Sequence, residues 1–408
     1  MPQTPLHGFR VLDLSRILAG PWASQTLADL GAHVIKIERP GVGDDTRQWG
    51  PPYLKDSGGN DTSDAAYFMA TNRGKYSVTV DLTTPGGQAV IRDLAKVSDV
   101  VIENYKVGGL KKYHLDYASL EEVNPKLVYC SITGFGQTGP YQQRAGYDFM
   151  IQGMGGLMSI TGEKDDLPGG GPQKVGVAVA DVFTGLYAAN AIQAALLERV
   201  QSGRGQHIDL ALFDVQAAVL ANQATNYLVG GVTPQRLGNA HPNIVPYQAF
   251  ATEDGFIILA VGNDGQFIKF CNVAGAPELA SDERFVTNAL RVKNRVAVCN
   301  QVAQLMETKN SEFWLSELEA AGVPCGPINS IDQVFNDPQL RQRGMRLTLQ
   351  HSTAGAVDLA GSPMHFSRTP AEASKAPPLL GEDTEIVLAE VLGYSDEKLQ
   401  ALKTDGSI

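Results

Sequence analysis

The sequence predicts an α/β protein: a large domain built on a parallel, doubly wound sheet with helices on both faces, and a smaller α+β domain. Short apolar runs alternate with amphipathic stretches in the first third of the chain, which is typical of repeated strand–helix–strand units. The character of the sequence changes near Gly230, where a segment rich in Gly, Pro and Asn begins.

In the large domain, the pattern predicts strands at 11–14 and 33–38 around a helix at 21–30, which has Pro21 in its first turn. A long helix is expected from Asp181 to the Ser-Gly-Arg-Gly sequence that starts at Ser202. The remaining expected elements are strands at 76–82, 100–104, 126–132 and 207–212, and helices at 85–97, 120–123, from 213 to about 228, and 384–392 as the last helix of the chain.

With 408 residues, the chain is long enough for two or three domains. We expect the large domain at 1–225 and the small domain with its linkers at 226–335. A hairpin and two helices, one of them at 311–321, are expected in the small domain. Residues 336–408 are then expected to return to the large domain.

Composition and charge exclude several classes of partner. Lys and Arg total 33 against 44 for Asp and Glu, and the resulting net charge of −11 repels phosphate backbones, so no nucleic acid is expected. The chain has no apolar run of membrane-spanning length and no secretory signal pattern. The four cysteines are far apart and form no CxxC pair, which favours reduced thiols in a cytoplasmic protein without a metal site.

The common catalytic and nucleotide-binding motifs are missing from this sequence. The expected first strand–helix turn, residues 13–21, has no GxGxxG pattern, and Pro21 lacks the N–H that a phosphate would require. The motifs GxSxG, HExxH and GxxxxGK[ST] do not occur either. These observations disfavour dinucleotide-dependent dehydrogenases, serine hydrolases, zinc proteases and P-loop enzymes.

Asp181 follows an apolar run and opens the predicted long helix, which leaves two interpretations. The simpler one is a helix N-cap, because Asp is common at that position. The other is a partly buried nucleophile towards an acyl group, beside helix N–H groups that stabilise an oxyanion. Position alone favours the N-cap.

Six segments together resemble the family III CoA-transferases (formyl-CoA transferase/carnitine CoA-transferase type). The closest likeness is to the dicarboxylate branch, exemplified by succinate–hydroxymethylglutarate (glutarate) CoA-transferase, in which NRxKxS, TRxWGPP and GxAHxxIVPYQAF recur. The resemblance covers nearly the whole chain in order. The segments are VLDLSRILAGPWASQTLADLGAHVIKIERPGVGDDTR, NRGKYSVTVDL, SITGFGQTGPYQQRAGYD, GVAVADVFTGLYAANAIQAALLERVQSGRGQHIDLALFD, GVPCGPINSIDQVFNDPQL and APPLLGEDTEIVL.

This resemblance implies a Rossmann-like large domain completed by the C-terminus, and an interlocked homodimer. It also makes Asp181 the catalytic nucleophile, which forms a mixed anhydride with the acyl group and then an enzyme–CoA thioester. The partners it implies are an acyl-CoA, with succinyl-CoA as the expected donor, and a carboxylic acid acceptor that we expect to be a dicarboxylate. CoA is then a co-substrate, and no further cofactor is expected.

The resemblance also assigns binding residues, position by position. A family lysine and a family glutamine of the formyl-CoA branch are replaced here by Thr83 and Leu18, which puts that lysine contact in doubt and disfavours oxalate as acceptor. The racemases of the same fold carry histidine where this chain has Tyr147, so an α-methylacyl-CoA racemase is the alternative function. The implied CoA-binding residues are Ile17, Leu18, Arg39, Asn104, Tyr105, Lys112, Tyr147 and Asp148, and the implied acid-binding residues are Arg73, Arg47 and His241.

Overall fold

The computed structural model describes residues 4–371 and 375–408, which form two compact units. The first unit is made of the described parts of residues 1–157, 175–228 and 338–408. The second unit is made of residues 158–174 and 229–337. The C-terminal segment therefore belongs to the first unit, whereas 158–174, which the sequence interpretation assigned to the large domain, belongs to the second.

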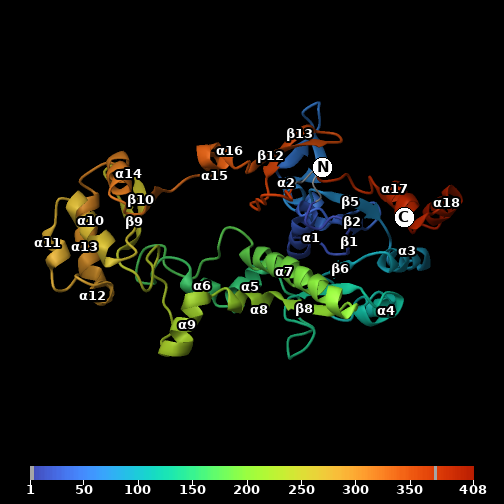
Figure 1. Cartoon of the computed structure of the whole chain (residues 1–408), viewed down its shortest axis with the longest axis horizontal. Coiled ribbons are helices and arrows are strands. Elements are labelled where there is room, and N and C mark those ends of the chain that lie inside the picture. Colours follow the sequence, from blue (N-terminus) through green and yellow to red (C-terminus); the bar gives the residue numbers. More distant parts are fainter. Residues whose placement is uncertain (1–3, 372–374) are drawn as a thin grey trace. The chain divides into compact units, whose positions relative to one another are not determined.

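The first unit contains a six-stranded parallel sheet in the order β5-β2-β1-β6-β7-β8, so the predicted fold class is confirmed (Figure 1). The chain runs outward from β1 in both directions, first through β2 and β5 and then through β6, β7 and β8. The loops after β1 and β6 therefore diverge, and such a crevice is the usual ligand site of an open α/β sheet. The strands are β1 (Arg10–Asp13), β2 (His33–Glu38), β5 (Lys75–Thr79), β6 (Val100–Glu103), β7 (Val128–Thr133) and β8 (His207–Ala211).

Each face of this sheet has its own apolar core, because successive residues of a strand point to opposite faces. Val11 packs in the core that contains α1 and α7, and the next residue, Leu12, packs in the core that contains α3, α4, α17 and α18. Burial on both faces explains why these strands are continuous apolar runs. The helices are α1 (Ala19–Asp29), α3 (Pro85–Lys96), α4 (Tyr117–Val123), α7 (Val179–Ser202), α17 (Thr384–Leu392) and α18 (Asp396–Thr404).

Gly185 allows α1 and α7 to pack closely. A Cβ on Gly185 would lie 2.7 Å from the carbonyl oxygen of Ala19 and 2.9 Å from the Trp22 Cβ, so no side chain fits there. The second turn of α7 is thereby held close to the first turn of α1, which follows the loop after β1.

Several elements of the first unit differ from those expected. The last helix is α18 rather than α17, and the helix expected from 213 to about 228 is divided at Ala221, whose φ is +48°. Two short antiparallel hairpins, β3–β4 and β12–β13, were not expected. The remaining elements are η1 (Asp45–Gln48), β3 (Tyr53–Lys55), β4 (Asp61–Ala65), α2 (Ala66–Met69), η2 (Lys111–Tyr113), α5 (Asp148–Met154), α8 (Leu212–Ala218), α9 (Ala221–Gly230), α16 (Pro338–Gln342), β12 (Arg346–His351) and β13 (Gly355–Ala360). The short helix α6 (Leu157–Ile160) belongs to the second unit except for its first residue.

The second unit is an α+β structure with an antiparallel sheet in the order β11-β10-β9. Helices pack on this sheet around a core that includes Phe267, Phe270 and Trp314. The described part of this unit has more helices than the two expected. The additional helices were not predicted because several of them are short and only weakly amphipathic. Its elements are β9 (Tyr247–Ala251), β10 (Phe256–Ala260), α10 (Asp264–Val273), α11 (Glu278–Ser281), α12 (Asn288–Lys293), α13 (Arg295–Met306), α14 (Ser311–Ala320), β11 (Cys325–Pro327) and α15 (Ile331–Asn336).

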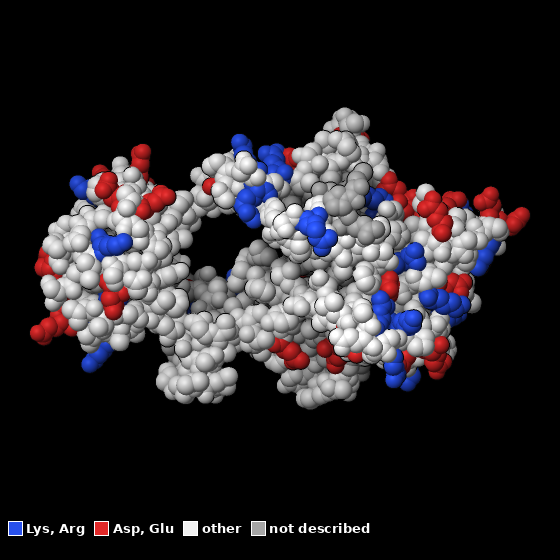
Figure 2. Space-filling model, in the orientation of Figure 1, with Lys and Arg blue, Asp and Glu red and all other residues white. Residues whose placement is uncertain are grey.

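Charged side chains of both signs are intermixed on the face drawn in Figure 2, and that face has no single basic tract. Within the described ranges, no helix combines the length and apolar character that crossing a membrane requires.

Candidate active site

Asp181 lies in the first turn of α7, but it is not the helix N-cap. The cap position is Ala178, and the capping carboxylate comes from Asp148, the first residue of α5. Oδ1 of Asp148 accepts hydrogen bonds from the N–H groups of Ala180 at 2.8 Å and of Asp181 at 3.3 Å. The N-cap interpretation of Asp181 is therefore wrong, because a carboxylate from a separate helix caps α7.

The same contacts leave no free N–H group in the first turn of α7 for an oxyanion. Besides the two N–H groups bonded to Asp148, that of Val179 donates to the Val177 carbonyl at 2.8 Å, and that of Val182 donates to the Ala178 carbonyl at 3.1 Å. The expectation that this helix end supplies oxyanion donors is not supported in this structure. Its contribution is to fix Asp181 in place.

The Asp181 carboxyl is in an environment that disfavours its charge. Burial, and secondly the negative charge of Asp148, raise its pKa from 3.8 to about 7. Within the described residues, no group donates a hydrogen bond to this carboxyl. A carboxylate that is poorly solvated and has a raised pKa is a stronger nucleophile than an ordinary aspartate.

A cavity of about 420 Å³ opens beside Asp181 at the diverging loops of the sheet. Its walls come from the loops after β1, β6 and β7. The loop after β7 folds tightly at Gly134 and Gly146, where a Cβ on either residue would lie within 2.5 Å of the other's Cα. Six of the predicted CoA-binding residues line the cavity together with Asp181: Ile17, Leu18, Asn104, Tyr105, Lys112 and Tyr147.

The other two predicted CoA-binding residues lie elsewhere. Arg39 lines a neighbouring cavity of about 370 Å³, which shares Arg16, Tyr105 and Tyr113 with the Asp181 cavity. Asp148 does not line the Asp181 cavity and instead caps α7. The two cavities are thus neighbours at the ends of the central strands, with Arg16, Tyr105 and Tyr113 in the walls of both.

Asn104 uses its side-chain amide to hold the loop after β1. Its Oδ1 accepts a hydrogen bond from the Arg16 N–H at 3.0 Å, and its Nδ2 donates to the Arg16 carbonyl at 2.7 Å. Asn104 therefore shapes the cavity wall through the backbone of Arg16.

Arg73 has a structural partner rather than a free guanidinium. Its Nε donates to Oδ1 of Asp29 at 2.9 Å, its Nη2 donates to Oδ2 of Asp29, and its Nη1 donates to the Ala360 carbonyl at 2.9 Å. Arg73 and Asp29 are both buried, and Arg73 does not line the Asp181 cavity. The geometry of the chain thus contradicts an acid-binding role for Arg73, because an internal carboxylate already occupies its guanidinium.

Arg47 is likewise engaged inside the first unit. Its guanidinium forms two hydrogen bonds with Glu38, at 2.8 and 2.7 Å, and one with Asp64 at 2.6 Å. It also lies over the Phe68 ring. The role predicted for Arg47 in binding the acid substrate is therefore not supported either.

His241 belongs to the second unit, between α9 and β9. Its Nδ1 accepts a hydrogen bond from the Asn243 N–H at 3.1 Å, and its ring packs near the Tyr247 ring. Burial and then the Arg295 charge lower its pKa. No observation tests its role in acid binding, which stays a prediction.

The Asp181 cavity has a strongly basic lining that the sequence interpretation identified only in part. Arg16, Lys106, Lys112 and Arg144 all line it. Arg16 forms an exposed ion pair with Asp45 at 2.9 Å, and Arg144 stacks on the ring of Tyr141. Only Lys112 was singled out from the sequence. The other three, Arg16, Lys106 and Arg144, could not be predicted from their positions in the sequence, because they come together from three different loops.

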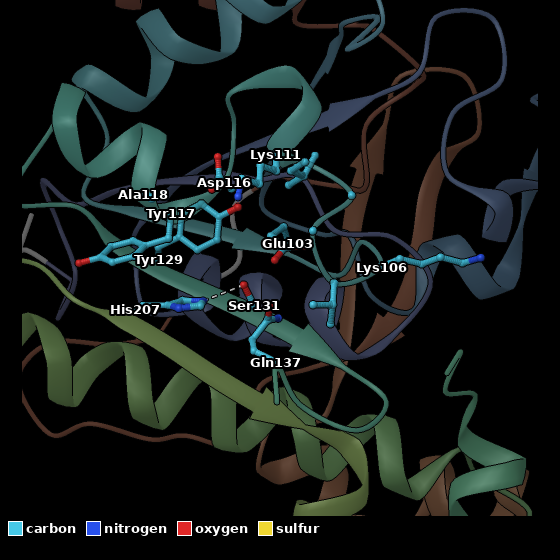
Figure 3. Close-up of a pocket in the computed structure, with 14 residues that line it drawn as sticks. Glu103, Lys106, Lys111, Asp116, Tyr117, Ala118, Tyr129, Ser131, Gln137 and His207 are labelled. Carbon is cyan, nitrogen blue, oxygen red and sulfur yellow. Dashed lines mark hydrogen bonds between the residues drawn. The ribbon is translucent and has the colours of Figure 1, made fainter. Parts of the chain in front are cut away.

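A third cavity, of about 320 Å³, is also lined by residues of the loop after β6 (Figure 3). Glu103, Ser131 and His207 line it, and Ser131 Oγ lies 2.9 Å from His207 Nε2. Burial raises the pKa of Glu103 to about 7, and its carboxylate accepts the Tyr105 N–H at 2.7 Å. Glu103 thus supports Tyr105 from behind the Asp181 cavity.

The comparison with family models identifies the protein family. The model of CoA-transferase family III matches residues 6–384. The chain belongs to this family. This family III enzyme is 55% identical to the succinate–glutarate CoA-transferase of Agrobacterium fabrum, over 95% of this chain and 96% of the relative. It is 43% identical to the succinyl-CoA:glutarate CoA-transferase of Homo sapiens, over 99% of this chain and 90% of the relative.

Solved structures of the family have the same fold. A CaiB/BaiF family protein from Brucella suis matches with a TM-score of 0.84 at 53% sequence identity, over 95% of this chain and 100% of that chain. This CoA-transferase thus carries a carboxyl of raised pKa, Asp181, in the lining of a cavity at the diverging loops of its sheet.

Proposed function

We propose that the enzyme transfers CoA from succinyl-CoA to a dicarboxylic acid, with glutarate as the first candidate, through covalent intermediates on Asp181. The observation that carries this proposal is the Asp181 carboxyl itself, which lies in a basic cavity and has a pKa raised to about 7. The names of the relatives support the choice of acids, since two relatives at 55% and 43% identity act on succinate or succinyl-CoA and glutarate.

The proposed reaction consists of acyl transfers without a change of oxidation state. An oxygen of the Asp181 carboxylate attacks the succinyl-CoA carbonyl, the C–S bond breaks, and CoA leaves as a thiolate. The thiolate then attacks the Asp181 acyl carbon of the mixed anhydride, which releases succinate and leaves an Asp181–CoA thioester. The acceptor carboxylate repeats these steps in reverse, and the Asp181 carboxylate is regenerated. CoA enters as a co-substrate, and we propose that no metal or further cofactor takes part.

The two adjoining cavities support a site for the whole CoA thioester. Arg39 lines one cavity and Asp181 the other, and Tyr105 lines both, so we propose that an elongated ligand places its polar end near Arg39 and its thioester at Asp181. The phosphates of CoA need cations in a protein of net charge −11, and Arg16 and Lys112 supply them locally.

The second carboxylate of a dicarboxylic acid also needs a cation. Because Arg73 and Arg47 are held in internal ion pairs, we propose that the basic residues of the Asp181 cavity bind it. Arg144 can present a planar guanidinium, which suits bidentate contact with a carboxylate.

The proposed assembly is an interlocked homodimer in the cytoplasm. Five large apolar side chains of α7, at positions 183, 186, 187, 197 and 200, are exposed on the single chain, and such a stripe suits burial against a second copy. Light scattering on dilution tests the dimer, because interlocked chains must unfold to separate, and a concentration-dependent monomer would refute it.

The proposed cytoplasmic location is supported by the cysteines. Those at positions 130, 271, 299 and 325 are free thiols, which suits a reducing compartment.

Isotope transfer tests the function. The enzyme is mixed with succinyl-CoA and ¹³C-labelled glutarate, and the CoA thioesters are followed by mass spectrometry. We expect labelled glutaryl-CoA to accumulate, and Asp181→Asn to form none. Trapping with hydroxylamine should modify Asp181 only when acyl-CoA is present. A lack of labelled thioester with every dicarboxylate tried would refute the proposal.

The alternative, an α-methylacyl-CoA racemase, has a distinct signature. Tyr147, which lines the cavity where the racemases carry histidine, is a poor proton shuttle at neutral pH. The racemase reaction would exchange the α-hydrogen of a 2-methylacyl-CoA with D₂O in the absence of any acceptor acid. We expect no such exchange.

A further inference from the structure

The loop after β1 carries a residue in an unfavourable backbone conformation. Ile17 has φ of +73°, in the left-handed region that β-branched residues rarely adopt. It lines the same cavity as Asp181. A conformation of this kind persists only where surrounding contacts hold it, and such residues are concentrated at ligand sites.

Asp44 makes a contact that holds Ile17. Both of its carboxylate oxygens lie 3.3 Å from the Ile17 nitrogen, whose N–H they share. Asn104 fixes the preceding residue, Arg16, from the opposite side of the loop. The Asp44 carboxylate therefore holds the backbone of Ile17, and the Asn104 side-chain amide holds the backbone of Arg16.

Asp44 itself is fixed by buried partners. Lys36 Nζ donates to Oδ2 of Asp44 at 2.9 Å, and both side chains are fully buried. Thr46 donates from its N–H at 3.0 Å and from its hydroxyl at 2.8 Å to Oδ1. The Asp44 N–H donates to Glu38 Oε2 at 2.9 Å. Burial alone would raise the pKa of Asp44, but the Lys36 charge and the Thr46 hydrogen bonds hold it below its usual range.

Lys36 connects this cluster to the loop a second time. Its ammonium also donates to the Ser15 carbonyl at 3.1 Å. Asp44 and Lys36 therefore bond to the backbone on both sides of Arg16. Asp44 is only 1% exposed; it lines the Arg39 cavity and not the Asp181 cavity, so its contact with the wall of the Asp181 cavity is made through the loop backbone.

We propose that Asp44 is a positioning residue for the acyl-CoA: through its contact with the Ile17 N–H, it holds the strained cavity wall against which the thioester is placed beside Asp181. The proposal rests on the proposed CoA-transfer function. It predicts that loss of the Asp44 charge weakens acyl-CoA binding through the conformation of Ile17, while the reactivity of Asp181 itself is retained.

A double-mutant cycle between Asp44 and Ile17 separates positioning from general structural support. Glycine adopts positive φ without strain, so Ile17→Gly removes the need for the Asp44 contact. We expect Asp44→Asn to raise the KM for succinyl-CoA about tenfold, with little change in kcat or in the KM for the acid. In the Ile17→Gly background, the same substitution should raise that KM less than about threefold. Asp61→Asn, which removes an exposed carboxylate from a surface ion pair, is the matched control.

Equal effects of Asp44→Asn in both backgrounds would overturn the proposal, as would a loss confined to kcat. If Asp44→Asn does not fold because Lys36 is left without its partner, the variant Asp44→Asn/Lys36→Met takes its place in both backgrounds. Equilibrium binding of succinyl-CoA by calorimetry provides a second readout and should follow the KM values. An inactive wild type would refute the proposed function, whereas an active wild type with additive effects refutes only the role of Asp44.

Discussion

Replacing Asp181 by asparagine should abolish CoA transfer and at the same time stabilise the folded protein. Asparagine has nearly the same shape but cannot form the anhydride, and it carries no charge into a site that disfavours one. A group whose folded-state pKa is raised binds its proton more tightly in the folded than in the unfolded state. The contribution of Asp181 to the free energy of unfolding is therefore greatest below its unfolded pKa of 3.8, and it falls as pH rises from 3.8 to about 7.

The magnitude follows from this pKa change. Each pKa unit corresponds to about 1.4 kcal/mol, so full ionisation of Asp181 costs at most about 4 kcal/mol. Because the carboxyl faces an open cavity, water screens part of this cost, and we expect about 1–3 kcal/mol. Asp148 bonds only to backbone N–H groups of α7 and not to the Asp181 side chain, so these hydrogen bonds are retained in Asp181→Asn.

The assay is urea denaturation of the wild type and Asp181→Asn at pH 4.5 and pH 8. The stability difference in favour of the variant should be small at pH 4.5 and reach its full value at pH 8. The control, Asp61→Asn, lies on the surface and should show little difference at either pH. An Asp181→Asn variant that is no more stable than the wild type at pH 8 would refute the view that the site disfavours the charge. Retained turnover would refute the covalent mechanism.

Three further predictions follow from other contacts. The kcat/KM for succinyl-CoA should increase with pH through about 7, since Asp181 must lose its proton to react, and a flat profile between pH 5.5 and 8.5 would contradict this. Glu103→Gln should raise the free energy of unfolding by about 1–3 kcal/mol at pH 8 but less at pH 4.5, because burial in the folded protein raises the pKa of this carboxyl from 4.5 to about 7. Equal effects at both pH values in urea denaturation would argue against this. Arg73→Ala should lower the free energy of unfolding by about 3–5 kcal/mol, because it leaves Asp29 buried and unpaired. If Arg73→Ala instead left stability unchanged and selectively raised the KM for dicarboxylates over butyrate, the acid-binding role would be restored.

Hydrophobic periodicity was sufficient to predict the sheet. The inner strands of the six-stranded sheet are buried on both faces, so they stand out as short apolar runs, and the predicted strand at 33–38 coincides with β2. The β3–β4 hairpin was missed because its strands are short and β4 is mostly polar, so neither strand shows a clear apolar alternation. The helix α18 was missed because it is mostly polar, and only two of its residues, Leu399 and Leu402, are buried.

The site was harder to predict, because its contacts join residues that are far apart in the sequence. The carboxylate that caps α7 comes from Asp148, 33 residues before Asp181. The partner of Arg73 is Asp29, 44 residues away, and no local pattern distinguishes a paired arginine from one that binds substrate. Six of the predicted CoA-binding positions do share the Asp181 cavity, and these came from the family resemblance rather than from periodicity.

The return of the C-terminal segment to the first unit has a consequence for synthesis on the ribosome. Asp383 accepts a hydrogen bond from the Ser77 N–H across 306 residues, and α17 packs on β5 within one apolar core. All six strands have been made once residue 211 has emerged, yet the edge at β5 stays uncovered until α17 has been made. The nascent protein therefore carries an exposed apolar surface while residues 212–383 are being translated. Protection by chaperones during this interval, rather than the stability of the finished fold, should determine the yield of native enzyme.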